Sequence, residues 1–194
     1  MRIISGTSKG RKLATPKDLS LRPTSDRVKE SIFNILRDQI EGRAVLDLFA
    51  GTGNLGIEAL SRGAKKVVFV EKGKRALRLI QRNVAQFGLA ERSEVLPIDA
   101  NRAIGVLKQR KILFDLIFMD PPYEQGLIER TLTKLNSHPI YHKDSILVVE
   151  HHRRELLSAA AGWDLIRQRQ MGETVVSILT PQQGEASIGA DTRP

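Results

Sequence analysis

Cysteine is absent from the 194-residue chain. Without thiols, a disulfide, an iron–sulfur cluster, a thiolate zinc site and a cysteine nucleophile are all excluded. Long hydrophobic runs are also missing, since a run such as Val67-Val68-Phe69-Val70 is far too short to cross a bilayer. The basic N-terminus has no apolar signal-peptide core. We therefore expect a cytoplasmic protein without a membrane partner.

Acidic residues are the scarcer charge: 22 Asp and Glu face 31 Lys and Arg, which gives a net charge of +9. Such a balance favours polyanionic partners, although it says nothing about the fold. The first thirty residues contain eight bases and three acids, which is more than half of the excess. A chain of this length, with 41% hydrophobic residues, suits one domain with an appendage.

The N-terminal segment, residues 1–42, differs from the rest of the chain. Residues 2–5 and 11–14 flank a turn that contains two glycines, which predicts a short hairpin. Thr24 or Ser25 can cap a helix that ends near Gly42. The apolar residues that we expect this helix to bury are Val28, Ile32, Phe33, Ile35 and Leu36.

From residue 43 onward, short apolar runs alternate with helical periodicity. Runs that are buried on both faces and separated by helices predict an α/β fold with a mostly parallel sheet. Two final runs around residues 171–173 predict an antiparallel C-terminal hairpin. This domain covers 43–181, and we expect 182–194 to be a flexible tail. The expected strands are 44–49, 66–70, 94–98, 114–119, 145–150, 163–170 and 174–180, and the expected helices are 55–61, 74–87, 103–108, 127–135 and 154–160.

A glycine-rich loop follows the first apolar run. Gly51, Gly53 and Gly56 have the G-x-G-x-x-G spacing, in which glycine lets a ligand approach main-chain N–H groups closely. Glu71 follows Gly51 by 20 residues and ends the next run, where a carboxylate can accept hydrogen bonds from both ribose hydroxyls. The pattern predicts a nucleoside ligand, a dinucleotide included. The alternative is a tight structural turn beside a solvated Glu71.

Two more acids belong to this region. Asp47 stands inside the first run, where a carboxylate is costly without a partner. It suits a cationic ligand or exposed N–H groups, and equally a buried, hydrogen-bonded strut. Asp99 ends the third run and could accept a proton from an adenine amino group. Its alternative role is to cap the next helix.

The tetrapeptide Asp120-Pro121-Pro122-Tyr123 follows the fourth run. In open α/β sheets, ligands lie beyond the carboxyl ends of the strands. The prolines stiffen the turn and hold the carbonyls of Asp120 and Pro121 as acceptors. With the Asp120 carboxylate, these oxygens could receive both protons of an exocyclic amine, while Tyr123 stacks on a base.

That arrangement indicates a specific reaction. An aromatic amine is a poor nucleophile, and acceptors that bind both of its N–H bonds free its lone pair for attack. The tetrapeptide therefore predicts direct methyl transfer by in-line displacement at a sulfonium carbon, with positioning and electrostatics supplying most of the acceleration. The alternative is a rigid loop with a capping Asp and a packing Tyr.

Together, the two motifs resemble the class I S-adenosylmethionine-dependent methyltransferases that act on nucleobase amines. The resemblance implies a Rossmann-like fold, S-adenosylmethionine as cofactor and S-adenosylhomocysteine as product. In that family the D-x-F-x-G-x-G loop holds the methionine part of the cofactor, and the acids after the second and third strands contact its ribose and adenine. The implied cofactor-binding residues are Asp47, Phe49, Ala50, Gly51, Thr52, Gly53, Glu71, Lys72, Asp99 and Ala100, and the implied catalytic residues are Asp120, Pro121, Pro122 and Tyr123.

The N-terminal segments 2–6, 10–13 and 21–30 resemble the narrower RsmD family, the 16S rRNA (guanine(966)-N(2))-methyltransferases. This resemblance implies that the substrate is a guanine N2 amine in ribosomal RNA, within a small-subunit assembly particle. The target guanine must leave its stack to reach the tetrapeptide. Arginines of the basic segment can bind phosphates in a forked geometry. The implied RNA-binding residues are Arg2, Lys9, Arg11, Lys12, Arg22 and Arg27.

Three other interpretations remain. A DNA adenine-N6 methyltransferase shares the tetrapeptide but usually carries an additional target-recognition domain. A nicotinamide-dependent oxidoreductase would use the glycine loop and Glu71, and would leave the tetrapeptide and the basic segment unexplained. A non-catalytic RNA-binding module or assembly factor is the third.

The histidines do not predict a metal site. His138 and His142 have helical spacing, but Pro139 lies between them, and the adjacent His151 and His152 would point apart on a strand. Without a strong signal for a dimer surface, we expect a monomer.

Overall fold

The computed structural model describes residues 1–15, 26–155, 157 and 162–182, and every structural statement below concerns these residues. The elements follow in the order α1 (Asp26–Leu36), β1 (Ala44–Asp47), α2 (Asn54–Ser61), β2 (Lys66–Val70), α3 (Lys74–Gln86), η1 (Ala90–Arg92), β3 (Ser93–Leu96), α4 (Ala100–Gln109), β4 (Phe114–Met119), α5 (Leu127–Ser137), β5 (Tyr141–His152), β6 (Trp163–Met171) and β7 (Thr174–Pro181).

The strands form a seven-stranded sheet in the order β3-β2-β1-β4-β5-β7-β6. The pairs from β3 to β5 are parallel, whereas β7 pairs antiparallel with both β5 and β6. The predicted α/β class and the antiparallel C-terminal hairpin are confirmed. The chain reverses its strand order after β3, so that β1 and β4 become neighbours, and this is where open α/β sheets bind ligands.

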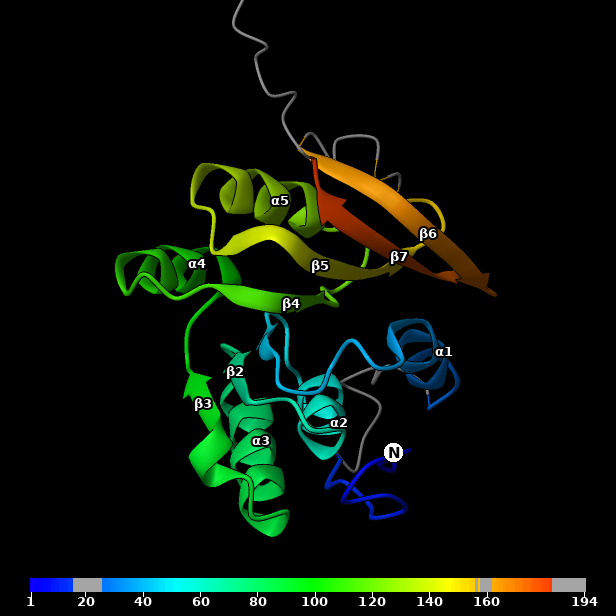
Figure 1. Cartoon of the computed structure of the whole chain (residues 1–194), viewed down its shortest axis with the longest axis vertical. Coiled ribbons are helices and arrows are strands. Elements are labelled where there is room, and N and C mark those ends of the chain that lie inside the picture. The colour runs from blue at the N-terminus through cyan, green and yellow to red at the C-terminus, as the bar shows by residue number, and fades with distance from the viewer. Residues whose placement is uncertain (16–25, 156, 158–161, 183–194) are drawn as a thin grey trace, which may run out of the picture.

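Helices cover both faces of the sheet, which explains the apolar runs of the central strands. Val45 of β1 belongs to the apolar core shared with α1, α2 and α3, whereas the next residue, Leu46, packs into the core shared with α4 and α5. In Figure 1, α4 and α5 lie on one side of β4 and β5, and α1 and α2 lie on the other. Both faces are thus removed from water, as in other parallel sheets.

The N-terminal residues form the predicted hairpin, which is only one bridge long. Arg2 pairs antiparallel with Lys12, and the Ile3 N–H donates to the Arg11 carbonyl at 3.0 Å. Gly6 has φ 81°, and a Cβ there would lie 1.8 Å from the Ser61 carbonyl oxygen at the end of α2. Glycine at this position therefore lets the hairpin dock directly on the sheet domain.

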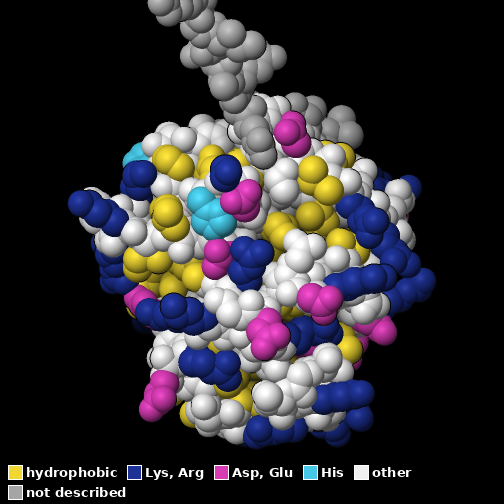
Figure 2. All heavy atoms as spheres, viewed as in Figure 1, with side chains coloured by type: hydrophobic (Ala, Val, Ile, Leu, Met, Phe, Trp, Pro, Cys, Tyr) yellow, Lys and Arg dark blue, Asp and Glu magenta, His cyan; other side chains and the backbone are white. Residues whose placement is uncertain are grey.

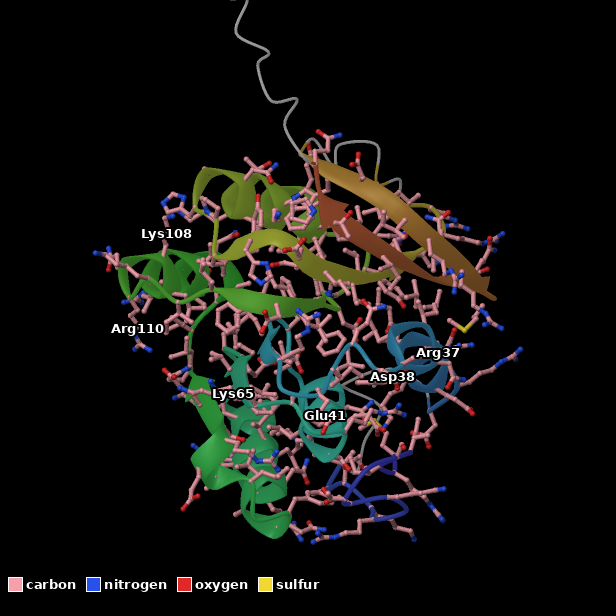
Figure 3. The ribbon with its side chains drawn as sticks, in the orientation of Figure 1. Arg37, Asp38, Glu41, Lys65, Lys108 and Arg110 are labelled. Atoms are coloured by element: carbon pink, nitrogen blue, oxygen red, sulfur yellow. The ribbon has the colours of Figure 1, made fainter. Side chains whose placement is uncertain are left out.

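The predicted end of the first helix is wrong. α1 stops at Leu36 rather than near Gly42, because Arg37 takes a left-handed φ of 41° and the chain folds back to bury Ile40. Figure 3 shows Arg37 and Asp38 beyond the end of α1. Ile35, expected in the core, is only half-buried. The cap candidates Thr24 and Ser25 lie outside the described residues.

Several other boundaries also differ from the prediction, most clearly those of β1, β3 and β5; β6 and β7 each end one residue later, and α4 begins at Ala100. β1 ends at Asp47, because the Leu48 N–H donates to the Phe118 carbonyl and the chain then leaves the sheet to form the loop. β3 runs over Ser93–Leu96, since Ile98 turns back to donate to the Leu96 carbonyl. β5 begins at Tyr141, which pairs with Phe114 of β4 before an irregularity shifts the register to Leu116 opposite Ile146. The expected helix 154–160 is not formed at residues 154, 155 and 157, because the chain turns there and the Glu155 N–H donates to the His152 carbonyl. Its other residues, and the expected tail beyond residue 182, lie outside the described residues. No described helix has the length and apolar character to span a membrane.

Candidate functional site

A cavity of about 860 Å³ opens at the carboxyl ends of the central strands. Asp47 of β1 lies in register with Phe69 of β2 and Phe118 of β4, so the loops that follow these strands converge. The lining residues are Val28, Leu48, Phe49, Ala50, Gly51, Thr52, Asn54, Val70, Glu71, Lys72, Ile98, Asp99, Ala100, Asn101, Asp120, Pro121, Pro122, Tyr123, Gln125, Leu127, Arg130, Thr131, Glu150 and Thr174. The glycine loop and the Asp-Pro-Pro-Tyr tetrapeptide therefore border one space.

Each of the three loop positions is occupied by glycine for a different structural reason. Gly51 lines the cavity at φ 54°, and a Cβ there would point into open space. Gly53, at φ 81°, begins α2 and lies outside the cavity lining. At Gly56 a Cβ would fall 2.3 Å from the Phe69 ring, so this glycine permits close packing of α2 on β2. Only Gly51 thus leaves room for a ligand.

Glu71 joins the loop to the start of α3. Its carboxylate accepts hydrogen bonds from the Gly51 N–H at 3.0 Å and from the Gly73 N–H at 2.6 Å. Glu71 is half-buried and borders the cavity. Because a carboxylate has about four acceptor positions, two remain for ligand hydroxyls. Because Glu71 binds two main-chain N–H groups, the alternative in which its side chain is simply solvated does not fit this geometry.

Asp47 is a buried strut beneath the loop and does not line the cavity. The Gly56 N–H donates to its Oδ2 at 3.1 Å. Burial raises the pKa of Asp47 to about 7, the Gly56 hydrogen bond opposes this shift, and the charges of Asp120 and Glu71 add to it. Of the two sequence interpretations, the geometry favours the strut.

Replacing Asp47 with Asn should stabilise the protein at pH 8 more than at pH 5. With its pKa raised above that of the unfolded chain, Asp47 binds a proton more readily in the folded state, so stability falls as pH rises through about 7. An asparagine can keep the Gly56 hydrogen bond and does not ionise. Urea unfolding at both pH values should show the difference between variant and wild type growing by on the order of 2 kcal/mol; a difference independent of pH would contradict this.

The far side of the cavity belongs to α4 and α5. Asp99 is exposed and caps α4, since its Oδ1 accepts from the Arg102 N–H at 3.0 Å, while it also borders the cavity. Asn101 and Thr131 line the cavity too, and their side-chain oxygens have no hydrogen-bond partner among the described residues. Sequence reasoning missed both.

Tyr123 is held in place from the opposite edge of the site. Its hydroxyl donates to Glu150 Oε1 at 3.1 Å and lies 3.1 Å from Thr174 Oγ1, and its ring centroid is 5.7 Å from that of His152. Burial, with contributions from Glu150 and Asp120, raises the pKa of Tyr123 to about 12, although the Thr174 bond opposes the shift. The ring is therefore neutral and fixed. Pro121 beside it is buried, Asp120 is half-buried, and Pro122 is exposed.

The residues that hold Tyr123 come from β5 and β7, and no motif in the sequence indicated them. Glu150 is 27 residues and Thr174 is 51 residues from Tyr123. His152 is itself bound through Nε2 to Glu173 Oε2 at 2.8 Å. The pairing of β5 with β4 brings Glu150 and His152 to the tetrapeptide, and the pairing of β7 with β5 adds Thr174.

The other histidines have separate structural partners. His142 binds Asp115 at 2.9 Å, His151 binds Ser177 at 2.9 Å, and His138 contacts Lys134. No group of three His, Asp or Glu side chains within the described parts of the chain could hold a metal ion. Trp163 packs in the core and donates to Asn136 at 2.9 Å.

Four of the predicted RNA-binding residues have exposed side chains: Arg2, Lys9, Lys12 and Arg27. Arg11 is exposed as well, but it also helps to dock the hairpin on α3. Its guanidinium donates to the Gln86 carbonyl at 2.6 Å and lies 4.4 Å from the centroid of the Phe87 ring. Arg22 lies outside the described residues. Figure 2 shows Lys and Arg side chains at the lower right of the view, where Figure 1 places the hairpin.

The parallel sheet with its antiparallel C-terminal hairpin, and the cavity at the point where the strand order reverses, define a Rossmann-like class I methyltransferase fold. A family model described as "Conserved hypothetical protein 95" matches residues 1–180, and the chain belongs to this family, the RsmD family.

Individual relatives agree with this assignment. The Bacillus subtilis protein YlbH is 40% identical over 92% of this chain and 97% of its own length. The Haemophilus influenzae protein named ribosomal RNA small subunit methyltransferase D is 36% identical over 89% of each chain. The solved structure of yhhF from Escherichia coli has a TM-score of 0.82 and 33% identity, and covers 94% of this chain and 98% of that one.

Proposed function

We propose that this protein transfers a methyl group from S-adenosylmethionine to the exocyclic N2 amine of a guanine in small-subunit (16S) ribosomal RNA. One observation carries the proposal: the glycine loop and the Asp-Pro-Pro-Tyr tetrapeptide border a single cavity, so a nucleoside cofactor and a target base can meet there. Relatives that are named ribosomal RNA small subunit methyltransferase D support RNA as the substrate. Guanine 966 is the position that the family resemblance implies.

The cavity residues fit S-adenosylmethionine, which supplies, when bound, a methyl group on a positively charged sulfur. Gly51 leaves space beside the main chain, and Glu71 keeps acceptor positions for ribose hydroxyls. Asn101 and Asp99 can bind the polar edge of an adenine. Phe49, Ala50, Thr52, Lys72 and Ala100 complete the proposed cofactor contacts, while Asp47 and Gly53 support the loop from beneath.

The tetrapeptide would hold the target amine. Asp120 accepts one N–H bond, and the main-chain carbonyls of the proline-stiffened turn accept the other, so that the nitrogen lone pair points at the methyl carbon. A strong base is not needed before attack, because the proton becomes acidic once the nitrogen is alkylated. Tyr123, fixed by Glu150 and Thr174, gives the flipped base a stacking surface.

Residues 1–42 would capture RNA, with 43–181 as the catalytic domain. The hairpin is not a loose appendage, since the N–H groups of Ile4 and Ser5 donate to Glu58 of α2. Its exposed basic side chains are thus presented at a fixed position relative to the cavity. We propose a cytoplasmic monomer that acts on a small-subunit assembly particle.

Mass spectrometry of nucleosides tests the proposal. Deproteinised small-subunit RNA and partly assembled particles, each incubated with protein and S-adenosylmethionine, should yield N2-methylguanosine. Duplex DNA under the same conditions should yield no N6-methyladenine. Preferential methylation of duplex DNA would favour the adenine-N6 interpretation. Titration with NAD and with S-adenosylhomocysteine distinguishes the oxidoreductase, because only the latter should bind.

Replacing Lys9 and Lys12 together with Ala should weaken RNA binding mainly through the salt-dependent part of the affinity. Each lost phosphate contact should reduce the slope of log K against log salt by roughly 0.7–0.9. Both side chains are exposed, and leaving Arg11 in place preserves the docking contacts of the hairpin. Filter binding at several salt concentrations measures the slope. An unchanged slope would remove these two lysines from the interface.

A further inference from the structure

Glu150 is a carboxylate of the cavity to which the proposed reaction gives no direct role. It is only 5% exposed, and it borders the same space as Asp120 and Tyr123. Burying a carboxylate is costly, and anchoring a tyrosine hydroxyl could be done by a neutral residue, as Thr174 does at the same distance. Glu150 therefore adds a carboxylate to the cavity lining beside the tetrapeptide, where it can act on a ligand as well as on the tyrosine.

The sheet register puts Glu150 next to the acceptor of the target amine. β4 and β5 pair in parallel with Phe118 opposite Val148 and Met119 opposite Val149. Asp120 is the first residue after β4, and Glu150 follows Val149 on β5, so the two residues follow the last paired positions of neighbouring strands, which are about 4.8 Å apart. A base whose amine reaches Asp120 can therefore present the N1 side of its edge toward Glu150.

The atom beside the amine differs between the purines. In guanine the N2 amine adjoins N1–H, which is a donor. In adenine the N6 amine adjoins N1, which is an acceptor and would face a carboxylate unfavourably. A site with two neighbouring acceptors therefore matches guanine and rejects adenine, in the way that polar sites discriminate between ligands that differ in one donor.

We propose that Glu150 is a specificity residue that selects guanine by accepting a hydrogen bond from its N1–H while Asp120 holds the N2 amine. This inference rests on the proposed function, since it names the atom of the target base that the same site recognises. Tyr123 contributes to base recognition in two ways: its hydroxyl donates to one Glu150 oxygen, and its ring offers the stacking surface.

The test uses the full chain and a short RNA that contains the guanine mapped by mass spectrometry, with a second RNA in which 2-aminopurine replaces that guanine. 2-Aminopurine retains the amine but has an acceptor at N1. The wild type should methylate the guanine RNA on the order of 100-fold faster, measured as kcat/KM. In Glu150→Gln, whose amide can donate to N1, this ratio should fall at least tenfold.

Tyr123→Phe is the matched control, because it removes the bond to Glu150 and keeps the carboxylate and the ring. It should lower both rates and leave the ratio unchanged. Glu150→Met, which has similar length and no acceptor, should reduce the ratio even if the Gln variant folds poorly. An unchanged ratio in the Glu150 variants, an equal fall in Tyr123→Phe, or equal wild-type rates on the two RNAs would each overturn the inference. Failure of the wild type to methylate any guanine RNA would instead overturn the proposed function.

Discussion

Replacing Asp120 with Ala is expected to lower kcat by about 100- to 1000-fold while S-adenosylhomocysteine binding stays close to that of the wild type. Removing one group that is positioned for the developing charge typically has an effect of this size. Asp120 borders the cavity at the tetrapeptide, whereas the proposed cofactor contacts come from the loops after β1, β2 and β3. Single-turnover methyl transfer and calorimetric titration of S-adenosylhomocysteine measure the two properties separately.

Asp120→Asn provides the control for this prediction. Its amide oxygen can still accept one N–H bond, so the variant should retain more activity than Asp120→Ala. If Asp120→Ala loses cofactor binding rather than turnover, then Asp120 belongs to the cofactor site and its proposed role in holding the target amine is wrong. If it keeps full biological activity, the non-catalytic RNA-binding interpretation is favoured.

Replacing Glu58 with Ala is expected to reduce the free energy of unfolding by about 3–5 kcal/mol. Glu58 is fully buried in α2 and lies 3.3 Å from the equally buried Lys29 of α1. Its carboxylate also accepts from the main-chain N–H groups of Ile4 and Ser5 and from Arg62. Removing it leaves the buried Lys29 ammonium without its counter-charge and two partly buried main-chain donors without an acceptor, so the docking of the N-terminal hairpin should weaken as well.

Lys29→Met is the matched variant for the same cluster, and it should reduce the free energy of unfolding by less than Glu58→Ala does. Glu58 would keep Arg62 and both hairpin N–H groups, while the methionine fills similar space without a charge. Burial lowers the pKa of Lys29 and its pairing with Glu58 opposes the shift, so the ammonium gains little net stability there. Urea unfolding gives both values; a Glu58→Ala change of less than about 1 kcal/mol would contradict the role of this cluster.

Sequence patterns predicted the sheet domain closely, because its signals are local. The runs at β2 and β4 have the predicted bounds, since strands buried on both faces must be apolar along their whole length. The glycine spacing and the Asp-Pro-Pro-Tyr turn identified both halves of the cavity for the same reason: a left-handed residue or a stiff corner requires particular residue types.

The length of α1 and the role of Asp47 were harder to predict. α1 ends early because Ile40 is buried in the core, which no local signal specifies. Asp47 could equally have been a ligand contact or a strut, and only its burial beneath the loop favours the strut.

The sequence by itself determined the order of the strands and helices along the chain, the glycine loop, and the proline-stiffened corner, because each depends on residues that are neighbours in the chain. The tertiary structure decided which distant side chains complete the site. Glu150 reaches Tyr123 because β5 pairs with β4, Thr174 reaches it because β7 pairs with β5, and Lys29 meets Glu58 only because α1 packs on α2. A contact between distant residues leaves no periodicity or spacing in the sequence, so such partners become visible only in the folded chain.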